Sequence, residues 1–275
     1  MIQAPDALTE GALNRIRPDV RAMHAYQVQP ATGLLKLDAM ENPYSLPPEL
    51  QRLLGERLGA LALNRYPGGR SAELCAALAR HANAPAGTAL MLGNGSDELI
   101  SLVSLACARQ SGEARAKVIA PLPGFVMYGM SAQLQGLDFV GVDLTPDFEL
   151  DEAAMLAAIA EHRPAITYLA YPNNPTATLW REAAMQSVID AAGQAGGIVV
   201  VDEAYQPFAS RSWMARMRAE PGRNGHVLLM RTLSKFGLAG VRLGYMIGPA
   251  ALVHEVDKVR PPYNVSVLNC EAALF

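Results

Sequence analysis

Short runs of apolar, often β-branched residues alternate with longer stretches rich in alanine and leucine over most of this chain. The short runs predict strands, which we expect at 88–92, 116–120, 138–144, 165–171, 197–203, 226–233 and 243–248. Several are apolar at every position rather than at alternate positions, a pattern typical of strands that are covered on both faces. The chain is therefore predicted to have an α/β fold built on a parallel or mixed sheet.

The stretches between the strands predict helices, which we expect at 71–83, 96–109, 125–135, 151–161, 181–194 and 249–258. In such a fold the functional loops gather at the carboxyl ends of the strands. The first 65 or so residues differ, because prolines interrupt them. We expect extended segments there, which wrap the sheet or reach toward a partner.

Composition narrows the class of protein. The 275 residues are 51% apolar and 18% charged with a net charge of -3, which suits one large core, or a large domain with a smaller one. This charge balance shows no excess of basic residues of the kind that binds nucleic acid. No apolar run approaches the length of a membrane span. The stretch "MIQAPDALTEGALNRIRPDV" lacks an apolar signal core, so a cytoplasmic location is expected. The cysteines and histidines are scattered, so no metal site is predicted.

A glycine-rich turn follows the first predicted strand in "MLGNGSDELISLV". Ser96 is a plausible N-cap for the next helix, and Asp97 and Glu98 suit its first turn. Free backbone N–H groups after such a turn, including that of Gly95, also form an anion site, typically for phosphate. A well-capped helix without a ligand explains the same residues.

Two acids end the apolar strand of "GIVVVDEAY", Asp202 and Glu203. A nucleotide hydrolase could use such an acid for magnesium, but it would also need a GxxxxGK[ST] loop. None of the four lysines, Lys36, Lys117, Lys235 and Lys258, follows a glycine or precedes serine or threonine, so this alternative is rejected. Asp202 can instead face a positively charged ring nitrogen.

Lys235 lies just past a predicted strand in "RTLSKFGLAGVRLGY", flanked by Thr232 and Ser234 and followed by Arg242. A partly desolvated lysine has a lowered pKa, and its free amine can form a Schiff base. The neighbouring hydroxyls and the arginine could hold a phosphate. In "AYPNNPT", Asn174 belongs either to a surface turn or to a ligand site as an amide donor. Together these features match the needs of pyridoxal phosphate.

In order and spacing, these motifs resemble those of the fold-type I pyridoxal-phosphate aminotransferases, and within them the histidinol-phosphate aminotransferase subfamily. The resemblance covers roughly residues 20 to 270 and rests on "LDAMENPY", "NRYPGG", "GNGSDELI", "PGFVMY", "YPNNPT", "VVVDEAY" and "RTLSKFGLAGVRLGY". Met40 and Ala177 depart from it, standing where the subfamily has asparagine and glycine. It implies a mixed, mainly parallel seven-stranded sheet between helices, and a homodimer.

The resemblance assigns catalytic roles to Lys235, Asp202 and Tyr205. Lys235 would form the Schiff base with pyridoxal phosphate and shuttle a proton, Asp202 would keep the ring nitrogen protonated, and Tyr205 would bond to the phenolic oxygen. The other implied cofactor contacts are Gly95, Ser96, Asp97, Thr232, Ser234 and Arg242 at the phosphate, Phe125 stacked on the ring, Asn174 at the phenolic oxygen and Tyr66 from the other subunit. Tyr26 and Asn174 are implied on the substrate side. The Asn174–Pro175 bond is expected to be cis.

The resemblance also implies a reaction and a domain plan. L-Histidinol phosphate and 2-oxoglutarate would give imidazole-acetol phosphate and L-glutamate, a step of histidine biosynthesis. An aromatic aminotransferase, a phosphothreonine decarboxylase, a sensor module and a cofactor-binding fragment with impaired catalysis remain alternatives. The domains would be an N-terminal extended segment with small-domain and dimer contacts (1–65), a cofactor-binding large domain (66–260), and the start of a small domain that is largely missing (261–275). The missing part would carry the arginine for the substrate carboxylate.

Overall fold

The computed structural model describes residues 7–24, 30, 32–34, 36, 39–108 and 114–275. The chain divides into two compact units, Met1–Ala39 and Met40–Phe275. The first unit contains helices α1 (Ala7–Leu13) and α2 (Pro18–Ala22). The second unit contains the sheet, the other helices and the residues of the candidate site described below.

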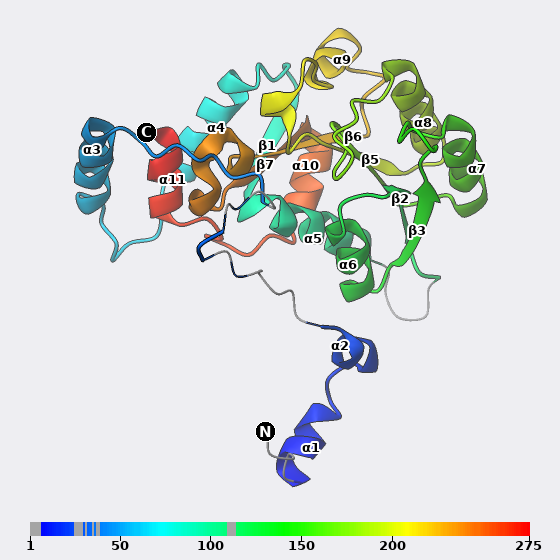
Figure 1. Cartoon of the computed structure of the whole chain (residues 1–275), viewed down its shortest axis with the longest axis horizontal. Coiled ribbons are helices and arrows are strands. Elements are labelled where there is room, and N and C mark those ends of the chain that lie inside the picture. The colour runs from blue at the N-terminus through cyan, green and yellow to red at the C-terminus, as the bar shows by residue number, and fades with distance from the viewer. Residues whose placement is uncertain (1–6, 25–29, 31, 35, 37–38, 109–113) are drawn as a thin grey trace. The chain divides into compact units, whose positions relative to one another are not determined.

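One sheet forms the centre of the second unit (Figure 1). Its strands are β1 (Thr88–Gly93), β2 (Lys117–Leu122), β3 (Asp138–Asp143), β4 (Ile166–Ala170), β5 (Ile198–Asp202), β6 (Val227–Thr232) and β7 (Gly244–Pro249). They lie in the order β1-β7-β6-β5-β4-β2-β3. Strand β7 runs antiparallel to β1 and β6, and the remaining neighbours are parallel. The predicted mixed, mainly parallel sheet of seven strands is confirmed.

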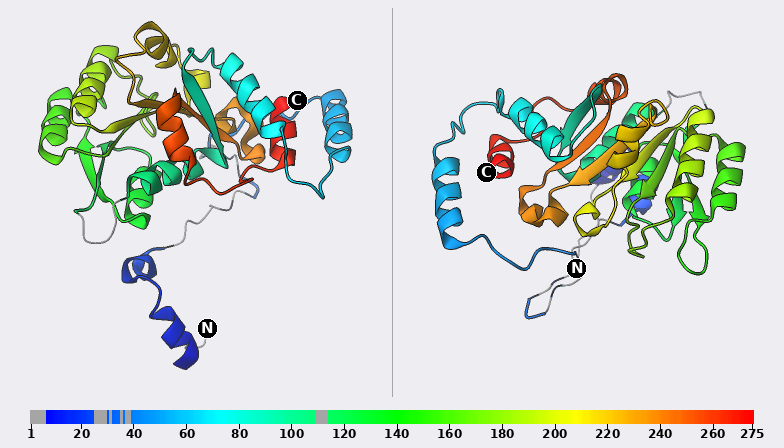
Figure 2. Two further views of the ribbon diagram at one scale, coloured as in Figure 1. Left: turned by 180° about the vertical axis from the view of Figure 1, so that it is seen from behind. Right: turned by 90° about the horizontal axis from the view of Figure 1, so that it is seen from above.

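Helices cover both faces of this sheet (Figure 2). On one face lie α4 (Arg70–His81), α7 (Glu152–His162), α8 (Glu182–Gln194) and α9 (Met214–Ala219); on the other lie α5 (Gly95–Cys107), α6 (Met127–Leu134) and α10 (Ala250–Asp257). The sequence of strand β5 is apolar because its side chains are buried on both faces of the sheet. Val199 and Val201 pack into the first core, and Val200 packs into the second.

The expectation of extended backbone through residues 1–65 is wrong for α1, α2 and α3 (Pro48–Gly59). Pro48 stands at the start of α3, where its missing N–H costs nothing and its fixed φ suits a helix. On the exposed side of α3, Arg52 pairs with Glu49 and Glu56 at helical spacing. The prolines at the start of α2 and α3 therefore begin helices where the sequence suggested interruption.

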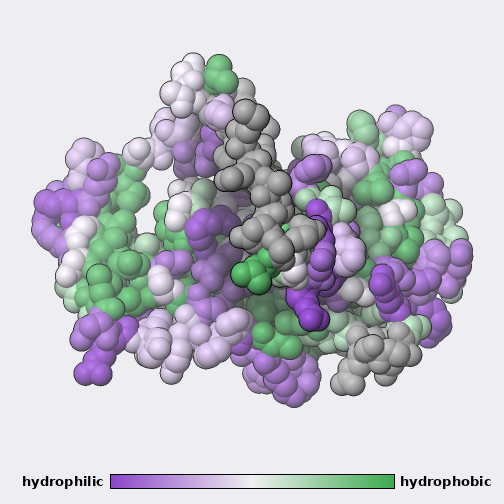
Figure 3. All heavy atoms as spheres, turned by 90° about the horizontal axis from the view of Figure 1, so that it is seen from below, coloured by the Kyte–Doolittle hydropathy of each residue, from purple (hydrophilic) through white to green (hydrophobic). Residues whose placement is uncertain are grey.

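Helix α11 (Val267–Leu274) packs against both α3 and α4. Its Glu271 is 1% exposed. The carboxylate of Glu271 forms ion pairs with the guanidinium of Arg57 on α3, at 2.5 Å, and with that of Arg70 on α4, at 2.6 Å. An apolar groove of about 590 Å³ lies beside these helices, lined among others by Leu54 and Phe236. Figure 3 shows hydrophobic side chains, in green, on the face of the molecule that it views.

None of the helices in the described residues is long and apolar enough to cross a membrane.

Candidate active site

Two adjacent acids at the end of β5 point to opposite faces of the sheet, because successive side chains of a strand alternate. Asp202 faces α6, where it contacts Tyr128. Glu203 faces the other side, where Arg231 of β6 donates two hydrogen bonds to it at 2.8 and 2.9 Å. Glu203 also accepts from the hydroxyl of Ser212 and from a backbone N–H at the start of α9, so its carboxylate is fully used by the fold.

Asp202 is 4% exposed and has two donors within the chain. The hydroxyl of Tyr128 donates to Oδ2 at 2.7 Å, and the backbone N–H of Ala204 donates to Oδ1 at 2.9 Å. Burial raises the pKa of Asp202 from its ordinary 3.8 to about 6, against the lowering effect of both hydrogen bonds. A buried carboxylate of this kind is ready to pair with a cationic ligand.

The lysine loop begins where β6 ends. A single π-helical turn spans Ser234–Leu238 and is followed by a 3₁₀ turn over Ala239–Val241. Lys235 Nζ lies 5.5 Å from the centre of the Tyr205 ring, which places the lysine beside the strand that ends in Asp202. The hydroxyls of Thr232 and Ser234 lie 2.9 Å apart and are both buried.

Arg242 connects this loop to the glycine-rich turn after β1. Its backbone is left-handed, at φ 52°, and its Nη1 donates to Ser234 Oγ at 3.4 Å. Its Nη2 lies 3.5 Å from a carboxylate oxygen of Asp97 in the first turn of α5. A Cβ added to Gly95 would stand 2.8 Å from the same Nη2, so any side chain there would fill this space. Glycine is also suited to the φ of 76° found at Gly95.

Helix α5 begins one residue earlier than expected. Its N-cap is Asn94, so the prediction that Ser96 caps the helix is wrong, and Ser96 lies within the first turn. The carboxylate of Glu98 accepts the backbone N–H of Asn94 at 2.6 Å. The N–H groups of the next residues have no helical partners, because they stand in the first turn of α5. With Arg242 beside them, these groups form a cradle suited to an anion.

The two asparagines of "YPNNPT" have different environments. Asn173 is buried and donates to the carbonyl of Pro123 at 3.2 Å and to Thr176 Oγ1 at 2.9 Å. Asn174 is half-buried, and the described structure shows no hydrogen bond of its side chain, so its amide is available to a ligand. The Asn174–Pro175 bond is cis, which confirms the prediction.

Two further residues of the prediction, Tyr66 and Tyr26, are not seen in contact with this cluster in the described residues. Tyr66 is 74% exposed and stacks on Tyr263 with 4.2 Å between ring centres. Tyr26 lies outside the described residues. Phe125 is half-buried and contacts the ring of Tyr128 edge-on at 5.6 Å. Sequence reasoning quoted "PGFVMY" for Phe125 and missed Tyr128, although an aromatic residue three positions further on was a usable signal.

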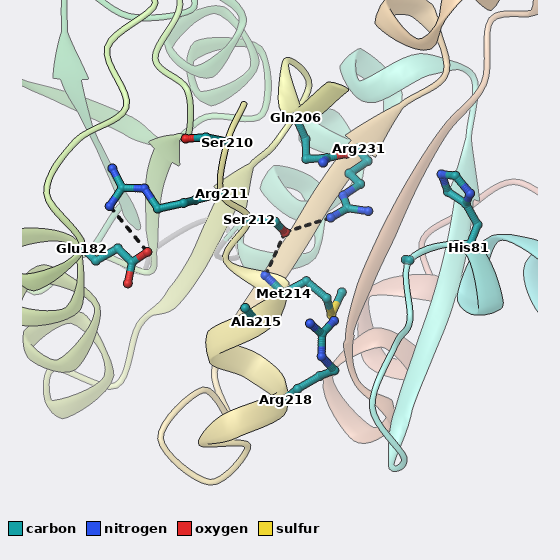
Figure 4. Close-up of a pocket in the computed structure, with 11 residues that line it drawn as sticks. His81, Glu182, Gln206, Ser210, Arg211, Ser212, Met214, Ala215, Arg218 and Arg231 are labelled. Atoms are coloured by element: carbon teal, nitrogen blue, oxygen red, sulfur yellow. Dashed lines mark hydrogen bonds and ion pairs between the residues drawn. The ribbon is translucent and has the colours of Figure 1, made fainter. Parts of the chain in front are cut away.

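An arginine-rich pocket of about 570 Å³ lies on the Glu203 side of the sheet (Figure 4). None of the residues predicted for the cofactor lines it. Its arginines have partners within the fold: Arg231 with Glu203, Arg211 with Glu182 at 3.7 Å, and Arg218 with the carbonyl of Asn83. Two of these three arginines therefore pair with acids of the fold, and Arg231 joins β6 to Glu203 and to Ser212 before α9.

The fold and the cluster at the strand ends define a class of protein, which comparison with known proteins identifies. Residues 32–274 match the model of the aminotransferase class I and II family, and the chain belongs to this family. It is 77% identical over 264 residues to the histidinol-phosphate aminotransferase of Paracidovorax citrulli (strain AAC00-1), covering 96% of this chain and 71% of that relative. It is 67% identical to the histidinol-phosphate aminotransferase of Polaromonas naphthalenivorans (strain CJ2), covering 99% of this chain and 73% of the relative.

A solved structure shares the fold. The crystal structure of histidinol-phosphate aminotransferase from Sinorhizobium meliloti in complex with pyridoxal-5'-phosphate matches with a TM-score of 0.77 at 26% identity. The match covers 94% of this chain and 70% of that one. The chain thus spans about 70% of the length of these relatives.

Proposed function

We propose that this chain is a pyridoxal-phosphate-dependent aminotransferase that acts on L-histidinol phosphate and 2-oxoglutarate. The observation that carries the proposal is the meeting of three sequence segments at one edge of the sheet: the turn before α5, the end of β5 and the Lys235 loop. The amino donor is taken from the relatives at 67–79% identity, whose names specify histidinol phosphate.

The residues present fit the cofactor. The anion cradle of Gly95, Ser96, Asp97 and Arg242, with the buried hydroxyls of Thr232 and Ser234, would hold its phosphate. The Asp202 carboxylate would pair with its ring nitrogen, Asn174 and Tyr205 would hydrogen-bond its phenolic oxygen, and Phe125 would contact its ring face. Bound there, pyridoxal phosphate supplies an aldehyde for the amino group and a ring that accepts electrons from the substrate carbon.

Lys235 would perform two tasks. Its Nζ would attach the cofactor, and the same amine would then take a proton from the substrate Cα and return one during transfer. Its position beside the Tyr205 ring keeps the amine next to the strand end that carries Asp202. We also propose that the protein is a homodimer in which Tyr66 reaches the partner's cofactor phosphate. Its exposed ring suits a contact with another chain. Tyr26 is proposed on the substrate side, and the location is proposed to be cytoplasmic.

Borohydride reduction of the purified protein with pyridoxal phosphate, followed by peptide mapping, tests the assignment. A pyridoxyl adduct is expected on the peptide that contains Lys235. Lys235→Ala should lose the adduct, while Lys258→Ala should keep it, because Lys258 is an exposed partner of Glu255. An adduct on Lys36, Lys117 or Lys258 in the unmodified sequence would refute the proposed site.

Half-reaction spectra identify the substrate. Addition of L-histidinol phosphate should shift the cofactor absorbance to that of the aminated form, and 2-oxoglutarate should reverse the shift. A faster response to phenylalanine or tyrosine would favour an aromatic aminotransferase. Release of carbon dioxide from phosphothreonine would favour the decarboxylase.

A further inference from the structure

The hydroxyl of Tyr128 is a second feature of the site, and the roles proposed above do not use it. It donates to Asp202 Oδ2 at 2.7 Å, and Tyr128 is only 2% exposed. A phenol has a single hydrogen to donate, and here it goes to this carboxylate. The bond therefore joins a buried donor to a buried acid at the centre of the site.

The neighbouring rings fix the direction of this hydroxyl. Tyr128 stacks on Tyr168 of β4 with 4.3 Å between ring centres and 6° between ring planes. Phe125 meets its ring from the side at 86°. The helix that carries Tyr128 is joined to α5 by the hydroxyls of Ser131 and Ser104, 3.2 Å apart. The phenol is thus held in place by contacts that do not involve Asp202.

The carboxylate is fixed at both oxygens. Ala204 donates its backbone N–H to Oδ1 at 2.9 Å, while Tyr128 donates to Oδ2. Hydrogen bonds to an ionised carboxylate favour that form, and bonds to both oxygens also prevent the group from rotating. The remaining lone pairs of the carboxylate stay available to a ligand.

We propose that Tyr128 is a positioning residue for the cofactor, whose hydroxyl keeps the Asp202 carboxylate ionised and in one orientation for the ring nitrogen of pyridoxal phosphate. The identity of this ligand rests on the proposed function. The coupling between Tyr128 and Asp202 does not, and it can be measured without any cofactor.

The surroundings of Asp202 otherwise favour its neutral form. Burial has the largest effect, and the charges of Asp97 on α5 and of Glu203 just after β5 act in the same direction. The two other phenols near it, Tyr168 on β4 and Tyr205 after β5, are uncharged near neutral pH. Tyr128 and the N–H of Ala204 oppose these influences. Loss of the Tyr128 hydroxyl should therefore move the titration of Asp202 to higher pH.

Tyr128→Phe tests this, with Tyr168→Phe as the matched control. Tyr168 belongs to the same stack and is equally buried, but its hydroxyl faces the carbonyl of Ile100 at 3.4 Å. Carbon-13 NMR of protein labelled at the aspartate side-chain carboxyls would follow the titration, and Asp202→Asn would identify the signal. The cofactor-free Tyr128→Phe protein should bind the Asp202 proton about tenfold more tightly, a midpoint about one pH unit higher, since a hydrogen bond to a charged group is lost. Tyr168→Phe should keep the original midpoint.

Cofactor binding provides the second measurement. At pH 7, Tyr128→Phe should bind pyridoxal phosphate about tenfold more weakly than the unmodified protein, and the difference should shrink as pH rises and Asp202 ionises again. Equal Asp202 midpoints in the Tyr128→Phe and Tyr168→Phe proteins would overturn the inference, even if the unmodified protein forms its adduct at Lys235. An unmodified protein that takes no cofactor would overturn the proposed function and the ligand assigned to Asp202, even if the titration shifts as expected.

Discussion

At the scale of single residues, the negative charge of the buried Asp202 lowers the stability of the folded protein. The pKa of this group in the folded protein is about 6, above its ordinary value of 3.8, chiefly because the group is buried. The folded state therefore binds the proton more tightly than the unfolded state does. The stabilising effect of protonation is fully present below about pH 4 and is lost as pH rises through about 6.

Asp202→Asn should therefore make the cofactor-free protein more stable at pH 8. The amide has nearly the shape of the carboxyl without its charge, so we expect a gain of about 1–3 kcal/mol in the free energy of unfolding at pH 8 and little change near pH 4. The same variant should transaminate slower by orders of magnitude, because the ring nitrogen loses its anion. Urea unfolding at the two pH values and steady-state rates would measure both effects.

Asp190→Asn is the control, because it should change the free energy of unfolding at pH 8 in the opposite direction. Its hydrogen bonds with Arg223 lower the pKa of Asp190, so its contribution to stability is present above the ordinary pKa and is lost as pH falls. This variant should be less stable than the unmodified protein at pH 8. If Asp202→Asn also loses stability at pH 8, the conclusion that the buried charge of Asp202 destabilises the folded protein is wrong.

Lys235 and Asp202 could be singled out from the sequence because each follows an apolar strand, and a strand end in an α/β fold leads to the site. The separation of roles between Asp202 and Glu203 follows from strand alternation, but only after the orientation of β5 is known. The sequence marks Tyr128 as an aromatic residue three positions after Phe125, but it does not show the contact with Asp202, which joins residues 74 positions apart. Such contacts depend on the packing of α6 against the sheet, which a single sequence does not encode locally.

At the scale of elements, β7 and the turn that starts α5 approach each other closely. A Cβ added to Gly244 would stand 2.6 Å from the backbone carbon of Gly95 and 2.8 Å from the backbone nitrogen of Ser96. Backbone atoms cannot rotate away as side chains do. The sequence motif "RLGY" therefore needs a glycine for the spacing between two elements.

Gly244→Ala should separate β7 from this turn. We expect a loss of about 1–3 kcal/mol in the free energy of unfolding, as in other overpacked sites, together with weaker cofactor binding. Gly240→Ala is the control, because a Cβ there meets nothing within 4 Å. Chemical denaturation and cofactor titration of the two variants would show the difference, and equal stability of both would refute the close-packing argument.

Glu271 is expected to hold α3 in its place. Glu271→Gln removes a buried charge that pairs with Arg57 and Arg70, whose side chains are 43% and 36% exposed. Breaking a fully buried pair costs about 3–5 kcal/mol, and this partial exposure lowers the expected loss to about 1–3 kcal/mol. Limited proteolysis should cut faster between α3 and α4. Glu255→Gln, which affects an exposed pair with Lys258, should change neither quantity measurably; an equal effect of the two would contradict the prediction.

The strands were predictable because parallel strands covered on both faces are apolar throughout, and helices α4 to α8 and α10 followed from helical spacing between them. Helix α3 was missed because the prolines before it were interpreted as interruptions, although Leu50, Leu53, Leu54 and Leu58 recur at helical spacing; none of these leucines is fully buried. Its position is fixed instead by Arg57 and Glu271, which are 214 residues apart.

At the scale of the whole molecule, the proposed dimer places Tyr66 of one chain at the site of another, which a complementation experiment can test. Tyr66→Ala and Lys235→Ala should each bind and turn over poorly as separate proteins. Co-expressed in equal amounts, they should recover about a quarter of the normal sites, because half of the dimers are mixed and each mixed dimer has one intact site. Native mass spectrometry would verify the mixed dimers. No recovery in verified mixed dimers would refute a shared site.

The position of β7 in the sheet has a consequence for the order of biosynthesis. Gly244 pairs with Gly93 of β1 on one side and with Thr232 of β6 on the other. Strand β1 is at the edge, so β7 alone joins it to the sheet. While the ribosome has released residues 88–93 but not residues 244–249, β1 has no neighbouring strand in the sheet. We therefore expect the proposed cofactor site to be completed in the nascent chain only when a late strand has inserted between two strands made earlier.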